Sequence, residues 1–193
     1  MAEHYQEGMT EMLTESQLLR ILPNARPVAE AFLAALNVAL PRWEIDKPRR
    51  MAAFIAQVGH ESGELRYVTE LGSDRYLARY DTGSLALRLG NTPQADGDGQ
   101  LYCGRGLIHI TGRDNYEACS RALFGDARLL AQPQLLELPR WACESAGWFW
   151  HSHGLNALAD RSEFNRITRL INGGLNGLES RLKFWARARE VLC

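Results

Sequence analysis

The sequence predicts a mainly α-helical fold with a small irregular lobe that contains short β segments. Apolar residues recur at the spacing of one helix face over most of the chain. Between about residues 72 and 106 this pattern gives way to a stretch rich in Gly, Asp and Asn, which indicates loops. With 193 residues and 46% apolar side chains, the chain is long enough for one domain around a buried core.

Three helices are expected in the first third of the chain, at about 14–22, 27–40 and 48–62. The first begins with the capping-box pattern of Thr14 and Gln17, in which two side chains bind free N–H groups of the first turn. The other two begin at Pro27 and Pro48, because proline fits the first turn of a helix. Gly63 can end the third helix in a left-handed conformation.

The middle of the chain is expected to hold loops and at most short strands. Residues 106–111 alternate and are rich in residues that favour β-structure, which predicts a strand there. In such a strand Leu107, His109 and Thr111 would share one face. The hydroxyl of Thr111 would then lie beside His109.

Four helices are expected in the C-terminal half, at about 113–123, 139–153, 161–172 and 177–192. Asp160 together with Glu163 is expected to cap the third of them. The aromatic run Trp148, Phe149 and Trp150 is assigned to the hydrophobic core in preference to sugar stacking.

Charge and cysteine content narrow the class of protein. The chain has 22 basic and 23 acidic residues, which argues against a general nucleic-acid binder. Its apolar runs are shorter than the roughly 18 residues of a membrane span, so no stable membrane anchor is expected. The acidic N-terminal segment lacks the pattern of a secretory signal, so a soluble protein located in the cytoplasm is expected. The four scattered cysteines predict reduced thiols.

Glu61 is a carboxylate that the helical pattern places where a charge is costly. Phe54, Val58 and Glu61 fall on nearly the same helix face, so Glu61 continues an apolar stripe. It also lies in the last turn, at the negative end of the helix dipole. Both effects favour the protonated form, which a general acid needs. A glutamate that only caps the helix or extends into solvent is the alternative that periodicity leaves open.

A second carboxylate, Glu70, follows nine residues later. On one unbroken helix the two would lie on opposite faces, roughly 13.5 Å apart. They can act together only if the chain turns between them, and Gly63 offers that turn. A separation of roughly 6.5–9.5 Å would admit a water molecule and would predict inversion at the anomeric carbon. Spacing alone leaves two solvated glutamates as the alternative.

Three motifs resemble those of glycoside hydrolase family 19 and occur in that family's order. Phe54–Gly63 resembles the end of its catalytic helix, and Gly104–Gly112 resembles its GRG segment, followed by Asn115. Ile171–Gly177 resembles its INGG motif, with Arg181 just beyond. The chain is most similar to the compact endolysin branch of phages and prophages, which has the same spacing between the two glutamates.

The resemblance implies a lysozyme-like fold of two lobes with a central cleft. It implies an inverting glycoside hydrolase that needs no cofactor and no metal. Glu61 would be the general acid and Glu70 the general base. Thr111 would help Glu70 to hold the attacking water.

The resemblance also implies substrate-binding and supporting residues. These are Gln57, His60, His109, Asn115, Asn172 and Arg181. Asn172 matches an asparagine that binds sugar, although an asparagine before two glycines also suits the end of a helix. Two residues depart from the family pattern. His109 replaces a glutamine and adds a titratable ring, and Glu64 adds a third nearby carboxylate.

The resemblance implies one catalytic domain over residues 1–193, with the motifs in about 50–190 and N-terminal helices at about 14–40 packed on it. The implied substrate is the β-1,4-linked amino-sugar strand of bacterial peptidoglycan, cleaved in cell-wall lysis. Chitin oligosaccharides are the alternative substrate. The enzyme is expected to be a monomer, and a separate holin-type protein would release it to the wall.

The sequence also allows two other classes of protein. A metal hydrolase could use His60 and Glu64, four residues apart, with His151 or His153. The zinc-protease pattern, however, needs a histidine where this chain has Glu64. A non-catalytic glycan-binding protein is the other class, but such a protein would not need both candidate glutamates.

Overall fold

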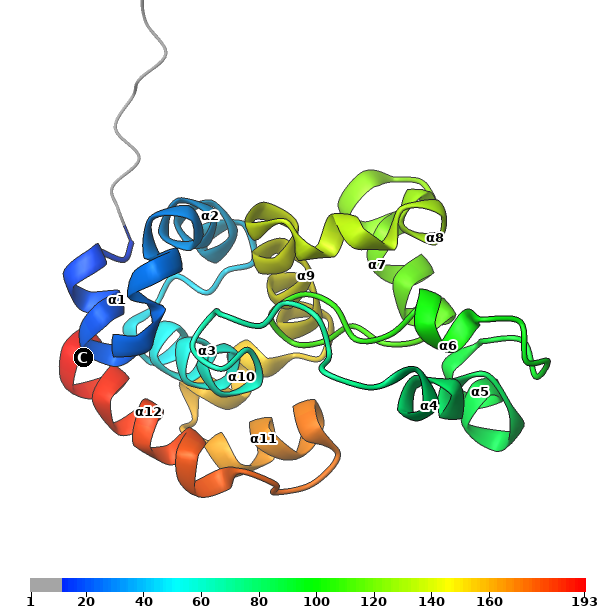
Figure 1. The fold of residues 1–193 in the computed structure, drawn as a ribbon. Coiled ribbons are helices and arrows are strands. Elements are labelled where there is room, and N and C mark those ends of the chain that lie inside the picture. Colours follow the sequence, from blue (N-terminus) through cyan, green and yellow to red (C-terminus); the bar gives the residue numbers. More distant parts are fainter. Residues whose placement is uncertain (1–11) are drawn as a thin grey trace, which may run out of the picture.

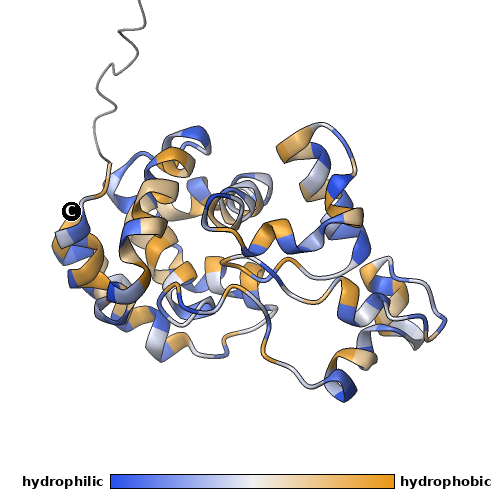
Figure 2. Ribbon diagram, turned by 45° about the horizontal axis from the view of Figure 1, so that its top comes forward, coloured by the Kyte–Doolittle hydropathy of each residue, from blue (hydrophilic) through white to orange (hydrophobic). Residues whose placement is uncertain are grey.

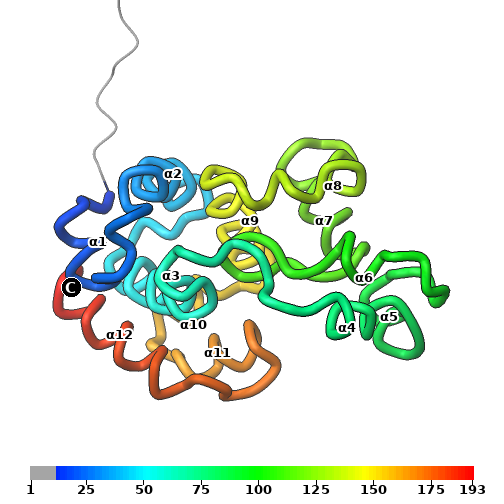
Figure 3. Tube along the Cα trace, viewed as in Figure 1, coloured from blue at the N-terminus to red at the C-terminus, as the bar shows by residue number. Residues whose placement is uncertain are grey.

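The computed structural model describes residues 12–193 and shows helices in two lobes, joined by one central helix (Figures 1 and 3). The larger lobe is built from α1 (Glu15–Ile21), η1 (Pro23–Val28), α2 (Ala29–Arg42), α3 (Pro48–Glu61), α10 (Leu155–Asp160), α11 (Phe164–Asn172) and α12 (Leu178–Leu192). The smaller lobe holds α4 (Asp74–Leu77), η2 (Ala78–Tyr80), α5 (Gly83–Leu89), α6 (Asp98–Leu101), α7 (Arg113–Phe124), α8 (Arg128–Ala131) and η3 (Pro133–Glu137). The central helix is α9 (Pro139–Ser152).

Most of the helices predicted from capping and periodicity are confirmed. The Thr14 side chain accepts from the Gln17 backbone and the Gln17 side chain accepts from the Thr14 backbone, so the capping box of α1 forms as expected. The third helix covers Pro48–Glu61, as predicted. The second begins two residues after Pro27, because Pro23–Val28 forms a 3-10 helix before it.

The middle of the chain differs from the prediction. It forms the short helices α4, α5 and α6 instead of loops and strands. The Ser73 hydroxyl caps α4 by accepting from the backbone of Tyr76, and Gly90 ends α5 in a left-handed conformation. The same polar and glycine residues that indicate loops therefore serve here as caps of short helices.

The strand predicted over residues 106–111 is wrong. Gly106 and His109 have φ values of 82° and 55°, which reverse the chain direction instead of extending it. What remains of β-structure in residues 12–193 is a pair of isolated bridges, Thr69 with Arg105 and Arg105 with Ile110. Thr111 still lies beside His109, because its hydroxyl donates to the His109 carbonyl oxygen at 2.8 Å.

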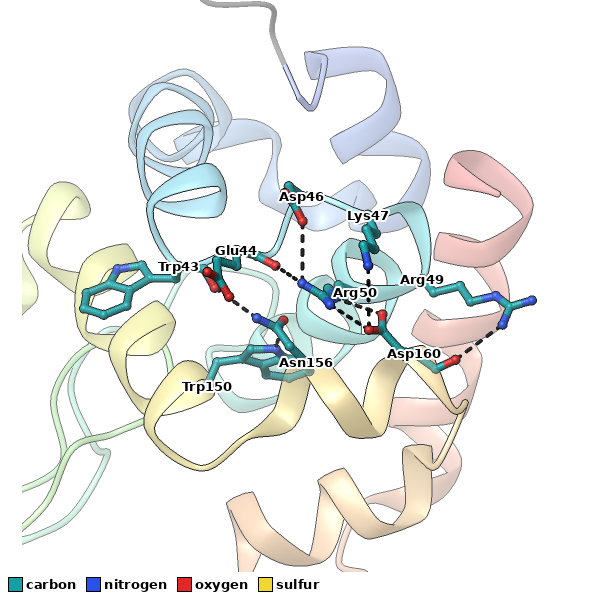
Figure 4. A network of polar contacts seen from close by, with 9 residues as sticks. All are labelled: Trp43, Glu44, Asp46, Lys47, Arg49, Arg50, Trp150, Asn156 and Asp160. Atoms are coloured by element: carbon teal, nitrogen blue, oxygen red, sulfur yellow. Dashed lines mark hydrogen bonds and ion pairs between the residues drawn. The ribbon is translucent and has the colours of Figure 1, made fainter.

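The cap predicted for the helix near residue 161 is also wrong. Asp160 is the last residue of α10, a helix that the sequence pattern did not predict. Its carboxylate binds Arg50 at the start of α3, at 2.9 and 2.6 Å (Figure 4). The helix α11 begins three residues later than expected, at Phe164, and Glu163 caps it without a side-chain hydrogen bond.

The position of α3 determines where the candidate site lies. Its residues from Met51 to Gly59 are buried, and the helix packs against α10 and α12. Gly59 allows close packing, because a Cβ atom there would lie 2.5 Å from a methyl group of Leu22. Phe54 meets Trp150 edge-to-face at 5.3 Å. Figure 2 shows that most helices carry both hydrophobic and hydrophilic residues, as helices that cover a core do.

The core has two parts. The larger cluster joins α1, α2, α3 and the C-terminal helices, and the smaller one is built around α7, α8 and η3. The central helix α9 contributes to both, since Phe149 packs against each cluster. Trp150 is fully buried, which confirms its assignment to the core, whereas Trp148 and Phe149 are half-buried.

None of the helices within residues 12–193 is both long and apolar enough for a membrane crossing. Most of the acidic N-terminal segment on which the signal-peptide prediction rests falls in residues 1–11, outside the described part of the chain.

We expect Asp160→Ala to lower the free energy of unfolding by about 1 kcal/mol, which corresponds to a melting temperature about 2–4 °C lower. The reason is that Arg50, whose side chain is only 14% exposed, loses its nearer ion-pair partner and keeps the more distant Asp46, at 3.7 Å. Glu179→Ala is the matched control, because its pair with Lys183 is 86% exposed on the glutamate side. Equal losses from the two changes, measured by thermal unfolding, would show that the Arg50 contact does not stabilise the fold.

Candidate active site

Glu61 ends α3 with its carboxylate bound by a buried arginine. The terminal Nη2 of Arg181 donates to Oε1 of Glu61 at 2.6 Å, and the two side chains are 2% and 17% exposed. The predicted stripe of Phe54 and Val58 is buried, so Glu61 does continue an apolar face. The guanidinium of Arg181 thus forms a partly buried ion pair with this carboxylate. The helical periodicity of the sequence gave no indication of this contact with Arg181.

A buried chain of hydrogen bonds holds Arg181. Its Nη1 donates to Oε1 of Gln57 at 2.6 Å, and Nε2 of Gln57 donates to the Thr168 hydroxyl at 2.8 Å. The Thr168 hydroxyl in turn donates to the Phe164 carbonyl oxygen. Gln57 and Arg181 are 0% and 1% exposed, so they lie behind Glu61. In this structure both residues support the carboxylate, which is the supporting role that the resemblance also implies, and a part of either in substrate binding stays a prediction.

His60 packs between the end of α3 and the start of α12. Its Nδ1 lies 3.1 Å from the Ser180 hydroxyl. A Cβ atom at Gly177 would lie 2.4 Å from the imidazole ring, so this close contact needs a glycine. Burial and the charge of Arg181 lower the pKa of His60 from its ordinary value of 6.5, against the opposing effect of Glu61. The ring is therefore neutral at pH 7 and acts as a packing group.

The chain turns sharply after α3, as predicted from Gly63. Three consecutive residues, Gly63, Glu64 and Leu65, have left-handed φ values of 55°, 63° and 67°. The Glu64 carboxylate accepts from the backbone and side-chain nitrogens of Asn24 at 2.8 and 2.6 Å. Glu64 is thus engaged by the N-terminal 3-10 helix and has a role separate from that of Glu61.

Glu70 is attached to the GRG segment on the other side of this turn. Its backbone N–H donates to the Gly104 carbonyl, and the Gly104 N–H donates to Oε2 of Glu70 at 3.0 Å. The Tyr80 hydroxyl donates to Oε1 at 2.8 Å. A Cβ atom at Gly104 would lie 3.1 Å from both Oε2 of Glu70 and Oγ1 of Thr111. Glu70 and Thr111 therefore flank the same glycine.

Tyr80 is a site residue that sequence reasoning missed. It lies in η2, within the stretch that was expected to be loops. The local signal available was its position on the same helical face as Tyr76, four residues earlier, whose hydroxyl lies 3.4 Å from that of Tyr80.

A pocket of about 210 Å³ lies between the two lobes. It is lined by Leu89, Ile108, His109, Ile110, Thr111, Asn115, Trp148, Phe149, His153 and Ile171. Three predicted site residues, His109, Thr111 and Asn115, meet there. The amide nitrogen of Asn115 donates to the Thr111 carbonyl at 2.7 Å. The Nε2 atom of His109 is buried without a hydrogen-bond partner, and so is the amide nitrogen of Asn172, which follows Ile171 at the end of α11.

The residues considered for a metal site are held apart by other partners. His60 contacts Ser180 and Glu64 contacts Asn24, at two different places around the end of α3. Within residues 12–193, no three His, Cys, Asp or Glu side chains form a group with the arrangement of metal ligands.

Comparison with known proteins finds relatives that align with most of the chain. A Haemophilus influenzae protein described as a glycosyl hydrolase family 19 domain-containing protein is 32% identical over 92% of this chain and 96% of its own length. An endochitinase of Arabidopsis thaliana is 33% identical over 75% of this chain and 47% of its own length. The chain thus spans about half the length of this plant relative. No family model matches the chain.

Solved structures of chitinases also superpose on this chain. Chitinase C from Streptomyces griseus HUT6037 superposes with a TM-score of 0.76 at 26% identity, over 96% of this chain and 95% of its own. A family GH19, class IV chitinase from Zea mays superposes with a TM-score of 0.57 at 25% identity, over 97% of this chain and 87% of its own.

We expect Arg181→Met to lower the free energy of unfolding by about 3 kcal/mol, because it leaves Glu61 and Gln57 without their buried partner. Arg187→Met, an exposed position on the same helix, is the control and should cost less than about 0.5 kcal/mol. Urea unfolding followed by circular dichroism measures both. The combination with Glu61→Gln should recover part of the loss. Equal stability of the two arginine variants would contradict this description of the site.

Stability should also depend on His60 below neutral pH. Because the pKa of His60 is lowered in the folded state, the unfolded chain takes up the proton first as the pH falls through 6.5. The free energy of unfolding should therefore fall more steeply between about pH 7 and 5 for the parent protein than for His60→Gln. The exposed His151→Gln serves as control. Parallel curves for the parent and His60→Gln would be the opposing result.

Proposed function

Because the chain belongs to glycoside hydrolase family 19, we propose that it cleaves the β-1,4 bonds between amino sugars of bacterial peptidoglycan by an inverting acid–base mechanism. The family and the fold are those of its relatives: a mainly helical, lysozyme-like fold, as in the family 19 chitinases. The chain is a glycoside hydrolase. In this proposal residues 1–193 act as one catalytic domain.

The arrangement around Gly104 is the observation that best supports the proposal. Glu70 is assigned as the general base, and both of its carboxylate oxygens accept a hydrogen bond, from Gly104 N–H and from Tyr80. Two donors thus hold the carboxylate in a fixed orientation, as a general base needs. Each oxygen keeps a further lone pair for a water proton. Thr111, beside the same glycine, is assigned to hold the attacking water together with Glu70.

Glu61 is assigned as the general acid that protonates the leaving oxygen. A bound sugar would exclude water from this partly exposed carboxyl group, and the loss of water favours its protonated form. As the proton is transferred, a negative charge develops on Glu61 next to the guanidinium of Arg181. Arg181 would stabilise this charge and so lower the barrier for the step.

The pocket between the lobes has the chemistry of an amino-sugar site. Trp148 and Phe149 offer apolar faces. His109 lines its wall, and Asn172 follows Ile171, which lines it as well. In the proposal the imidazole and the amide bind a sugar hydroxyl or an acetamide oxygen. In this proposal Asn115, which lines the pocket, contacts the substrate, and His60 supports the end of α3.

One feature of the sequence favours peptidoglycan as the substrate. The nine-residue spacing from Glu61 to Glu70 is typical of the compact endolysin branch that the sequence resembles. In cell-wall lysis the enzyme would act as a monomer after a separate holin-type protein gives it access to the wall. Chitin is the second candidate substrate, because several relatives are endochitinases or chitinases.

We expect the purified protein to release reducing ends from peptidoglycan sacculi in the presence of a metal chelator. Glu61→Gln should lower the rate by about a thousandfold or more, Glu70→Gln by about a hundredfold or more, and Thr111→Ala by about tenfold. Circular dichroism should show that all three variants stay folded. Near-normal hydrolysis by Glu61→Gln would refute the assignment of the acid.

The same assay identifies the substrate. Sacculi and the N-acetylglucosamine hexamer are hydrolysed in parallel, and mass spectrometry of the products identifies the reducing sugar. Muramic acid or glucosamine ends from sacculi would support the proposal and name the bond. Hydrolysis of the hexamer alone would establish the chitinase alternative in its place.

A further inference from the structure

Tyr80 connects the small lobe to the candidate base. Its hydroxyl lies 2.8 Å from Oε1 of Glu70, whereas the Tyr76 hydroxyl lies farther away, at 3.4 Å. A phenol has a single proton to donate. The Glu70 carboxylate is both the nearer and the stronger acceptor for it than the Tyr76 hydroxyl. The Tyr76 ring packs edge-to-face on the Tyr80 ring at 6.0 Å. These contacts fix both the ring and its hydroxyl.

The backbone around Tyr80 is anchored by buried polar groups. The Asn91 side chain donates to the Tyr80 carbonyl at 2.9 Å and accepts from the Arg113 N–H at the start of α7, also at 2.9 Å. Asn91 is 4% exposed and Asp81 is 5% exposed. Asp81 accepts from the Gly99 N–H, which ties η2 to α6. Tyr80 is thereby held at a fixed place relative to the segment that carries Thr111.

The proton of Tyr80 stays on the phenol over the working pH range of a protein. Burial, followed by the hydrogen bonds to Tyr76 and Glu70, raises the pKa of Tyr80 above its ordinary value of 10.0. Tyr80 is therefore a permanent donor to Glu70. It complements Gly104 N–H, which donates to the other carboxylate oxygen at 3.0 Å.

We propose that Tyr80 is a positioning residue of the hydrolysis: its hydroxyl orients the Glu70 carboxylate for activation of the attacking water. One donor on each oxygen fixes the plane of the carboxylate and leaves one lone pair on each oxygen for the water. The inference rests on the proposed function, in which Glu70 is the general base. It assigns to the helical segment α4–η2 an indirect part in the hydrolysis, through Glu70.

The test is Tyr80→Phe, which removes the hydroxyl and keeps the ring. On whichever of sacculi or the N-acetylglucosamine hexamer the parent hydrolyses faster, kcat should fall about tenfold while KM changes less than about twofold. The acidic limb of the pH–rate profile should move to higher pH, because the ionised carboxylate loses a donor. Tyr102→Phe, which loses a hydroxyl contact to the Leu130 carbonyl in the same lobe, is the control. It should leave both the rate and the profile unchanged.

A second readout does not depend on activity. The ¹³C signal of the Glu70 side-chain carboxyl group, assigned by its loss in Glu70→Gln, should titrate at higher pH in Tyr80→Phe than in the parent. An unchanged titration, or an unchanged pH–rate profile, would overturn the inference even if kcat falls, since a merely structural loss would affect neither. Full activity of Glu70→Gln is a different result, because it would overturn the proposed function itself.

Discussion

The buried guanidinium of Arg181 is the constraint on which the site depends. An arginine with 2% side-chain exposure has no water to solvate its charge, so its N–H groups need protein acceptors. They are supplied by Glu61 and Gln57 from α3 and by the Asn176 carbonyl just before α12. These contacts fix α3 and α12 relative to each other. As a result, the last side chain of α3 is held at the edge of the core, partly exposed and next to a positive charge.

The second carboxylate is positioned independently of the first. Three left-handed residues after Ser62 turn the chain away from α3. Glu70, on the connection from α3 to α4, then pairs with Gly104 in the segment between α6 and α7. Tyr80 and Thr111 approach it from the small lobe. One glutamate thus belongs to the large-lobe helix and the other to the connection between lobes. Tertiary packing, and not their spacing in the sequence, therefore determines where the two glutamates lie relative to each other.

The sequence predicts those parts of this architecture that depend on neighbours in the chain. The capping box at Thr14, the apolar stripe of α3 and the turn at Gly63 are all local signals, and all are confirmed. The strand prediction for residues 106–111 is wrong, because these β-favouring side chains occupy a reverse turn. The turn is stabilised by packing of Leu107 in the core. The Arg181–Glu61 contact joins residues 120 positions apart, and no local pattern indicates it. The spacing of Tyr76 and Tyr80 is a local signal, but it does not indicate that Tyr80 binds Glu70.

The central claim is that Glu61 and Glu70 act on opposite faces of one sugar, with a water between the base and the anomeric carbon. The most direct measurement is the anomeric configuration of the first product, followed by proton NMR before mutarotation. A single displacement by water at a β-linked sugar predicts the α-anomer as the initial product. An initial β-anomer would contradict the account, because it requires retention and therefore a different arrangement of the reacting groups.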